Sequence, residues 1–428
     1  MGFKTNRIRI EKICLSLFDI AIKIMGKRLI VKNFGPIKEI DIDLKKINVF
    51  IGPQGSGKST LAKIISFCSW LDKRRSDDGV YVGAYKRLTS YHKLHDYFKD
   101  DTLIYYQGDN IIYAYGWPDG ETIPADDFKV GNSYHVDEKE LILFNVHPSV
   151  NPKVIYIPAE RNFVSAVPNL QDYVEGDDSL HGFILDWYRA KNKYSLSNPL
   201  GLLNLGVKFY SAGPASDYIL HDGGKSLRLN ASASGYQSVV PLLAVVDWLS
   251  NGIYKEAKPF SAAEEKKITE LLGNLSDATD SLEMQELKQR LKGIVEGKVY
   301  THTQFVVEEP CQNLFPEAQR DLIYYLISSL DHGKNHRLVM TTHSPYVLAS
   351  LNNLIYAHKV GQINKEAVEK IIPSYSWIDF NDINVFFVAD GGVESILDDE
   401  LKLIKAEKID GISTVLNEEF DKLLELEE

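Results

Sequence analysis

The sequence is poor in cysteine and in long apolar runs, and lysine and arginine are outnumbered by acids. Its three cysteines, Cys14, Cys68 and Cys311, form no Cys-x-x-Cys pair, which excludes a disulfide framework or zinc site and favours a reducing compartment. No segment approaches the ~18 uncharged apolar residues of a membrane-spanning helix. We therefore expect a cytoplasmic protein with no membrane partner. The net charge of −11 argues against bulk electrostatic coating of nucleic acid.

The composition, with 44% hydrophobic and 25% charged residues, is that of a globular chain. Short apolar runs alternate with helical patterns, which predicts an α/β fold with a mixed, mostly parallel sheet between helices. Aromatic-rich alternation over 79–150 adds an antiparallel β subdomain, and a helical subdomain follows. Strands are expected at Leu29–Phe34, Ile40–Leu44, Ile47–Ile51, Val154–Ile157, Phe305–Val307, Leu338–Met340 and Leu354–Tyr356.

These patterns divide the chain into five expected parts. The apolar stretch near the start is interrupted by Lys12, Asp19 and Lys23 and lacks a cleavage site, so it is interpreted as an extension rather than a signal peptide. A membrane-surface helix is the alternative there. The parts are an N-terminal extension at 1–27, a first lobe at 28–169, a helical subdomain at 170–300 with a charged insertion at 251–299, a second lobe at 301–392 and an acidic helical tail at 393–428.

A phosphate-binding loop follows the strand Ile47–Ile51 and opens a helix. Its residues are Gly52, Pro53, Gln54, Gly55, Ser56, Gly57, Lys58, Ser59 and Thr60, and they match G-x4-G-K-[ST]. Backbone N–H groups of such a loop surround phosphates, and the helix start adds partial positive charge. Lys58 supplies a point charge to the phosphates, and the Ser59 hydroxyl can bind Mg²⁺.

Two adjacent carboxylates, Glu308 and Glu309, follow the buried strand Phe305–Val307. Buried carboxylates need a cation or hydrogen bonds, so Glu308 is a candidate Mg²⁺ ligand and Glu309 a candidate base for the attacking water. His343 follows a third apolar strand, at the strand end where ligands bind in open α/β sheets. We predict that Glu309 and His343 are catalytic.

A second anion-binding turn is expected around Ser234 and Gly235, ahead of the apolar helical stretch Val239–Leu249. Serine and glycine at a helix start can bind an anion, and a plain helix cap is the alternative. Pro241 removes a hydrogen bond inside that stretch. Either the helix starts late or it is kinked.

Taken in order, the phosphate loop, the turn at Ser234-Gly235-Tyr236-Gln237, Glu309-Pro310 and His343-Ser344-Pro345 resemble the motifs of ABC-type P-loop ATPases. The branch they resemble most contains the structural-maintenance-of-chromosomes (SMC), RecF-like and overcoming-lysogenization-defect (OLD) ATPases. This resemblance implies a homodimer, or a higher even homo-oligomer, with ATP between the heads. Ser234, Gly235 and Gln237 would then serve the other chain's ATP.

The sequence departs from that branch in several places. Glu308 stands where an Asp is usual, which predicts slow turnover, and Tyr236 replaces a signature glycine. Pro158–Arg161 is the candidate for the γ-phosphate-sensing loop. The segment between Thr60 and Ser234 contains no long coiled-coil pattern, and the tail after Asp390 is too short for the Toprim nuclease of the OLD enzymes.

ATPases of this build resemble the ATPase subunits of anti-phage systems such as Septu and PARIS. The resemblance implies a sensor or scaffold that controls a separate nuclease or toxin encoded by a neighbouring gene, with DNA or a phage protein as trigger. A RecF-like repair ATPase that loads on DNA through Lys73-Arg74-Arg75 or Lys86-Arg87 is the main alternative. A transporter energy subunit and a non-hydrolysing ATP-gated scaffold are two others.

Overall fold

The structure is a computed structural model. It places most of the chain but not the predicted extension before residue 26, nor Arg74, Arg75 and much of 251–299. The described residues are 26–73, 84–118, 121–124, 130–135, 139–145, 150–167, 170, 178–255, 262–277, 284, 287–288, 291, 299–331, 333–405 and 407–426.

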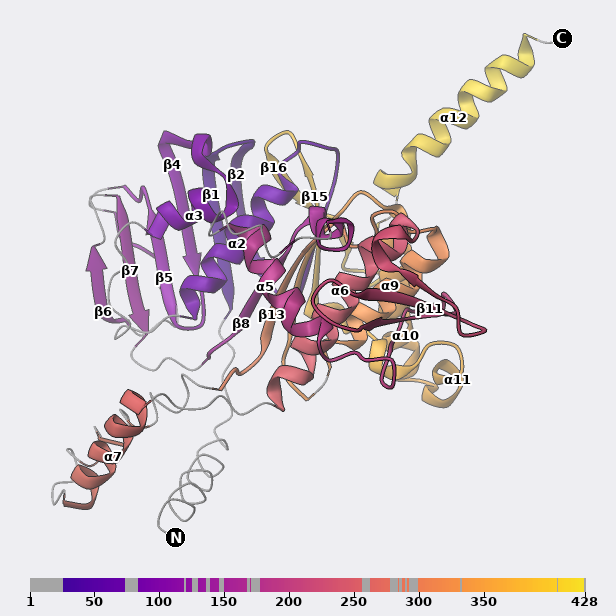
Figure 1. Ribbon diagram of the computed structural model, residues 1–428. Helices are drawn as coiled ribbons and strands as arrows, with labels where there is room; N and C mark the ends of the chain where they lie inside the picture. Colours follow the sequence, from indigo (N-terminus) through magenta and orange to yellow (C-terminus); the bar gives the residue numbers. More distant parts are fainter. Residues whose placement is uncertain are drawn as a thin grey trace.

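A six-stranded sheet forms the centre of the molecule (Figure 1). Its strand order is β16-β15-β3-β14-β13-β8. Every strand except β16 runs parallel to its neighbours. The three middle strands are buried along their whole length, as expected for a parallel sheet covered on both faces. The bounds are β3 Ile47–Ile51, β8 Lys153–Ile157, β13 Thr303–Glu308, β14 Arg337–Thr342, β15 Ile383–Ala389 and β16 Gly392–Ser395.

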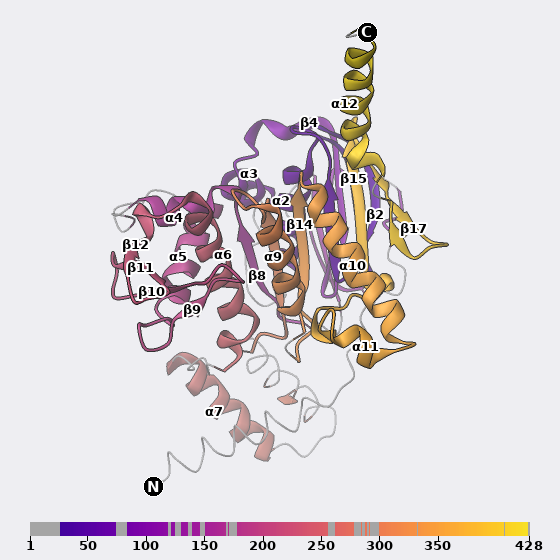
Figure 2. The ribbon, with the colours of Figure 1, turned by 90° about the vertical axis from the view of Figure 1, so that its right-hand side faces the viewer.

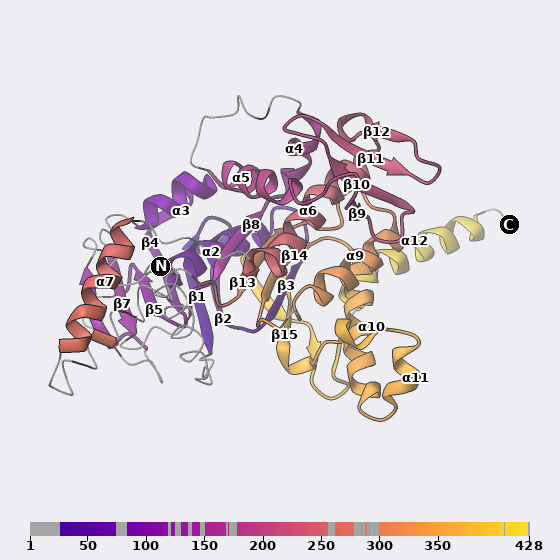
Figure 3. The ribbon, with the colours of Figure 1, turned by 60° about the horizontal axis from the view of Figure 1, so that its bottom comes forward.

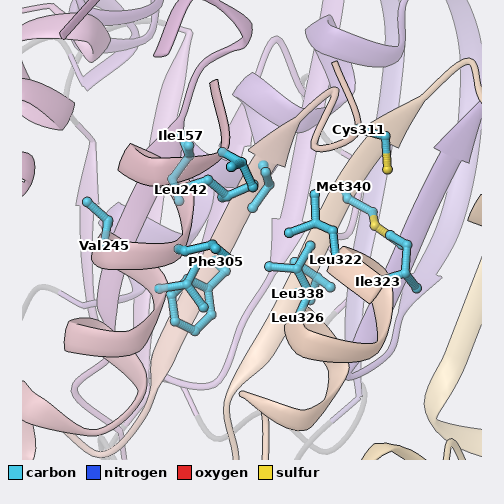
Figure 4. Packing of buried hydrophobic residues seen from close by; sticks show 14 of the residues in the cluster. Ile157, Leu242, Val245, Phe305, Cys311, Leu322, Ile323, Leu326, Leu338 and Met340 are labelled. Atoms are coloured by element: carbon cyan, nitrogen blue, oxygen red, sulfur yellow. The ribbon is translucent and has the colours of Figure 1, made fainter. Parts of the chain in front are cut away.

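Side chains alternate between two cores across this sheet. Along β13, Phe305 and Val307 pack into one core, and Val306 packs into the other. Figure 4 shows the first core, where Phe305 and Met340 meet residues of two helices, including Leu242 and Leu326. The helices of this core are α5 Ser179–Lys191, α6 Ser234–Ser250, α9 Pro316–Ser328 and α10 Pro345–Gly361 (Figure 3).

The second core lies between the central sheet and an antiparallel sheet, with α2 (Lys58–Asp72) between them. This sheet has the order β2-β1-β4-β5-β7-β6, and a four-stranded antiparallel sheet, β12-β11-β10-β9, lies beside α6. The strands of the first antiparallel sheet are β1 Lys27–Phe34, β2 Ile37–Leu44, β4 Phe98–Gln107, β5 Ile111–Tyr115, β6 Val130–His135 and β7 Glu140–Asn145. Those of the second are β9 Leu200–Gly201, β10 Val207–Ser211, β11 Asp217–His221 and β12 Ser226–Arg228. The other described helices are α3 Ala84–His92, α4 Phe163–Ala166, α7 Ala262–Asp277, α11 Lys365–Glu369 and α12 Glu407–Glu425. The predicted α/β class, with its mostly parallel and antiparallel sheets, is confirmed.

Three sequence-based assignments differ from the structure. Leu354–Tyr356 is not a strand but part of α10, since its apolar residues belong to a helical face. The tail 393–428 is not helical throughout, because β16, β17 (Leu397–Asp398) and β18 (Leu403–Ile404) precede α12. The helix expected at Val239–Leu249 begins earlier, at Ser234, with Pro241 inside it.

Helix α12 extends away from the rest of the molecule (Figure 2). Leu416, Phe420 and Leu423 on it are all more than half exposed. Among the residues that the structure describes, no helix combines the length and the apolar character needed to cross a bilayer.

Candidate active site

The predicted phosphate loop connects β3 to α2 in the structure. Gly52 has a φ of 153°, and a Cβ there would lie 2.2 Å from the carbonyl oxygen of Val388. Gly57, at φ 108°, is the residue just before α2. Only glycine adopts such backbone conformations without strain, so these positions shape the loop at the start of the helix.

Lys58 is buried at the first position of α2 and turns back over the loop. Its Nζ donates hydrogen bonds to the carbonyl oxygens of Gly52 at 2.9 Å and Pro53 at 2.7 Å. Burial lowers the pKa of the Lys58 ammonium, and the nearby charge of Glu309 raises it. The cation therefore lies inside the loop, and the exposed Ser59 follows it in the first turn.

Glu308 is the last residue of β13 and is only 5% exposed. Its Oε1 is buried and has no well-formed hydrogen bond among the described residues, although the Tyr156 hydroxyl lies beside the carboxylate. An unpaired buried carboxylate oxygen is costly, and a cation would remove that cost. Among the described residues no group of three His, Cys, Asp or Glu side chains is arranged to hold a metal ion, so a cation here would complete its shell with phosphate and water oxygens, as Mg²⁺ usually does.

Glu309 takes a left-handed backbone conformation, with a φ of 41°. Its amide donates to the carbonyl oxygen of Thr341 at 3.1 Å, which joins the turn to β14. The His343 amide donates to Glu309 Oε2 at 3.2 Å, and His343 Nε2 lies 3.4 Å from Glu309 Oε1. Burial raises the pKa of the Glu309 carboxyl, while His343 and Lys58 lower it.

The sheet order explains why these residues meet. β3 leads into the phosphate loop, β13 ends at Glu308, and β14 ends directly before His343. The strands are parallel and adjacent in the order β3-β14-β13, so their carboxyl ends lie at one edge of the sheet, where ligands bind in such folds. Lys58, Glu308 and His343 therefore lie near Glu309, and each of them affects the pKa of its carboxyl group.

The predicted second anion-binding turn lies at the N-terminus of α6, which begins at Ser234. A Cβ on Gly235 would lie 2.9 Å from the carbonyl oxygen of Asn313, so the turn packs on the segment after Glu309. Gln237 Nε2 donates to the carbonyl oxygen of Ser232 at 2.8 Å, which places this amide inside its own turn. Ser234 is exposed.

Arg161, expected in a γ-phosphate-sensing loop, is placed differently. It is completely buried, and its guanidinium donates to backbone carbonyl oxygens, including those of Glu308 and Glu309, at 2.9 and 2.8 Å. The guanidinium is therefore not available to a phosphate. Its partners are 147 and 148 residues away in the chain, and no local pattern in the sequence indicates such a contact.

A family described as the AAA ATPase domain matches residues 25–304, more than half of the chain. The chain belongs to this AAA ATPase domain family. It is therefore an ATP-binding ATPase, a class that typically uses a divalent metal. A comparison with curated proteins gave no match.

Three solved structures illustrate the similarity in fold. The SMC head domain from Thermotoga maritima is 12% identical, with 87% of this chain and 98% of that chain covered and a TM-score of 0.36. The Smc head domain bound to ScpA from Pyrococcus furiosus is 11% identical, with 92% and 99% covered and a TM-score of 0.37. The recombination mediator RecF is 9% identical, with 87% and 98% covered and a TM-score of 0.31. Because these scores are low, the family assignment rests on the sequence match.

Proposed function

We propose that this protein hydrolyses ATP with Mg²⁺ and that two copies close over the bound nucleotides. The observation that carries the proposal is the meeting of Lys58, Glu308, Glu309 and His343 at the ends of three adjacent strands. Loop residues Gly52–Thr60 would bind the phosphates, and Ser59 and Glu308 would hold the metal.

The chemistry follows from the positions of the side chains. Water attacks the γ-phosphorus, Glu309 accepts its proton, and the bond to the β–γ bridging oxygen breaks to release ADP. When bound, Mg²⁺ neutralises developing charge on the phosphate oxygens. The raised pKa of Glu309 suits a base, and His343 orients its carboxylate. Lys58 supplies positive charge to the transferred group.

The partner copy would supply the second anion-binding turn. Ser234 is exposed at the start of α6, where helix N–H groups attract an anion. Because Ser234 is exposed and so accessible to a second copy, we assign it, with Gly235 and Gln237, to the γ-phosphate of the other protomer. The lobes 28–169 and 301–392 would act together, since both supply strands to the central sheet.

The test combines phosphate release with molar mass in solution. We expect wild type to release phosphate from ATP only with Mg²⁺, and Glu309→Gln to bind ATP but turn it over at least 100-fold more slowly. We expect Glu309→Gln to elute as a dimer with Mg-ATP and as a smaller species without it. Ser234→Glu should remove the dimer and keep nucleotide binding. Dimers of Ser234→Glu with ATP would contradict the shared site.

We further propose that the ATPase controls a separate effector protein in an anti-phage complex. Support comes from α12, whose exposed Leu416, Phe420 and Leu423 lie among acids such as Glu418 and Glu419. That combination fits a protein groove with an apolar floor and basic rim. Co-expression with the product of a neighbouring gene tests this, since Phe420→Glu should abolish co-purification and preserve hydrolysis.

The DNA-loading alternative gains no support from Arg87, although Lys86 beside it is exposed. The guanidinium of Arg87 lies 4.3 Å from the centroid of the Trp70 ring and 4.5 Å from that of Tyr91. Arg87 is thus used inside the fold as a cation–π partner. Binding of duplex DNA with a steep salt dependence would revive the alternative.

A further inference from the structure

A single buried arginine joins the carboxylate turn to the helix that carries the second anion-binding turn. Arg161 lies in the short 3-10 turn Ala159–Asn162 after β8 and has no exposed surface. Its Nη1 donates to the carbonyl oxygen of Glu308 at 2.9 Å, and its Nη2 donates to those of Glu309 at 2.8 Å and Pro310 at 2.9 Å. Three successive peptide groups are therefore held by one guanidinium.

The same side chain also reaches α6. Nε of Arg161 donates to the carbonyl oxygen of Ser238 at 3.2 Å. Pro241 lies inside α6, and because proline has no N–H, the carbonyl oxygen of Gln237 lacks its usual helical donor. The Ser165 hydroxyl donates to that oxygen at 2.8 Å. The first turns of α6 are therefore bonded to the segment 159–166.

The hydrogen bonds of Arg161 offset the free-energy cost of burying its guanidinium. Removing a guanidinium from water is expensive unless hydrogen bonds replace the lost hydration. Arg161 makes no ion pair within the part of the chain that the structure describes. Backbone carbonyl oxygens accept all of its hydrogen bonds, and the nearby charges of Glu309, Glu308 and Glu160 also favour the cation. Its planar fork can bond several carbonyl groups at once, which a lysine ammonium cannot reproduce.

We propose that Arg161 is a positioning residue that couples the carboxylate pair at the nucleotide to the N-terminus of α6. The inference rests on the proposed function and extends it. A shift of the Glu308–Glu309 backbone on binding nucleotide and metal moves the guanidinium. The guanidinium moves the Ser238 carbonyl and so Ser234, the residue that we assign to the partner's phosphate.

Hydrogen exchange in a Ser234→Glu background tests the coupling without the dimer contact. The probe is AMP-PNP with Mg²⁺, a non-hydrolysable ATP analogue. We expect it to slow exchange in peptides of the phosphate loop and to change exchange in α6 peptides by at least threefold. In Arg161→Lys the loop effect should persist and the α6 effect should vanish. An α6 effect of unchanged size in Arg161→Lys overturns the proposal, as does the absence of any α6 effect in the parent.

Lys191→Met is the control for disturbing a buried cation and its bond to a carbonyl oxygen elsewhere in the fold. Lys191 is 1% exposed and donates to the carbonyl oxygen of Pro214 and the carboxylate of Asp217, at 2.7 and 2.8 Å. We expect this variant to lose thermal stability and to keep the α6 effect. Loss of the α6 effect in Lys191→Met would show a general response to destabilisation and overturn the specific role.

Kinetics separate the coupling from the proposed activity. In the otherwise wild-type protein we expect Arg161→Lys to lower kcat at least tenfold while affinity for a fluorescent ATP analogue stays within twofold. Unchanged kcat in Arg161→Lys, with only a lower melting temperature, would mean a structural role and overturn the proposal. If wild type shows no hydrolysis but the α6 effect depends on Arg161, the proposed function fails and the coupling stands.

Discussion

His343 contacts both carboxylate oxygens of Glu309, through its ring Nε2 at 3.4 Å from Oε1 and through its backbone amide at 3.2 Å from Oε2. The amide contact depends only on the backbone, whereas the ring contact depends on the side chain. Removing the His343 side chain would therefore keep the amide bond that positions the Glu309 carboxylate but remove the ring that affects its charge.

Replacing the ring should weaken catalysis without abolishing nucleotide binding. In His343→Ala the amide bond to Glu309 remains and the ring contact is lost. We expect kcat for ATP hydrolysis to fall about 10- to 100-fold, within the range typical of a group that assists acid–base catalysis, and the affinity for ATP to change less than threefold. Phosphate release and equilibrium binding measure the two quantities. A kcat within twofold of wild type would refute this role.

As the pH is lowered, hydrolysis should be lost at a higher pH than the one at which an ordinary glutamate is protonated. A base must be ionised, and burial raises the Glu309 pKa above its usual 4.5. Activity is therefore full above the raised pKa and is lost as the pH falls through it. Because His343 lowers the pKa of Glu309, the acid midpoint in His343→Ala should move to higher pH. A profile of kcat from pH 4.5 to 8 tests both statements, and a midpoint that does not move contradicts the second.

Removing the carboxylate charge at Glu308 should weaken metal activation. Glu308→Gln keeps the size of the side chain but loses the charge whose Oε1 is buried without a well-formed hydrogen bond in the described structure. We expect the Mg²⁺ concentration for half-maximal hydrolysis to rise at least tenfold, and EDTA to stop hydrolysis in wild type. Asn48→Asp, at a buried position on the opposite end of β3, adds a carboxylate elsewhere and should leave the Mg²⁺ dependence unchanged. Equal Mg²⁺ curves for Glu308→Gln and wild type would exclude Glu308 as a ligand.

At α6 the Ser165 hydroxyl replaces the helical hydrogen bond that Pro241 cannot donate to the Gln237 carbonyl oxygen, and this replacement can be tested. Ser165→Ala leaves the Gln237 carbonyl oxygen unpaired, which costs about 1–3 kcal/mol of unfolding free energy. Pro241→Ala restores an N–H to the helix, so the double variant should recover most of the loss. Urea unfolding of the single and double variants measures this. No recovery in the double variant would mean that the Ser165 hydroxyl acts through another contact.

Much of the candidate site follows from the sequence because each part is local to one strand end. The phosphate loop, Glu308 and His343 each come directly after an apolar run, and the parallel order of those runs then brings them together. The roles of these residues stay predictions until measured. The fold class is confirmed, since alternating strands and helices leave few arrangements.

The wrong strand assignment and the contacts of Arg161 that the sequence did not indicate have separate physical causes. A short apolar run such as Leu354–Tyr356 fits a strand or a buried helical face equally well, and only its neighbours in α10 decide the question. The partners of Arg161 come from Ser238 and from a turn about 150 residues away, so neither periodicity nor a motif could indicate them.

The position of β3 sets the order in which the catalytic centre can be assembled during synthesis. β3 pairs with β14 on one side and β15 on the other, and in these ladders Ile47 is paired with Leu338, 291 residues later, and with Ile383, 336 residues later. Pairings of such long sequence separation form slowly. The nascent phosphate loop therefore waits, without its sheet neighbours, until residue 389 has left the ribosome. We therefore expect chains that end before β15 to lack a complete ATP pocket.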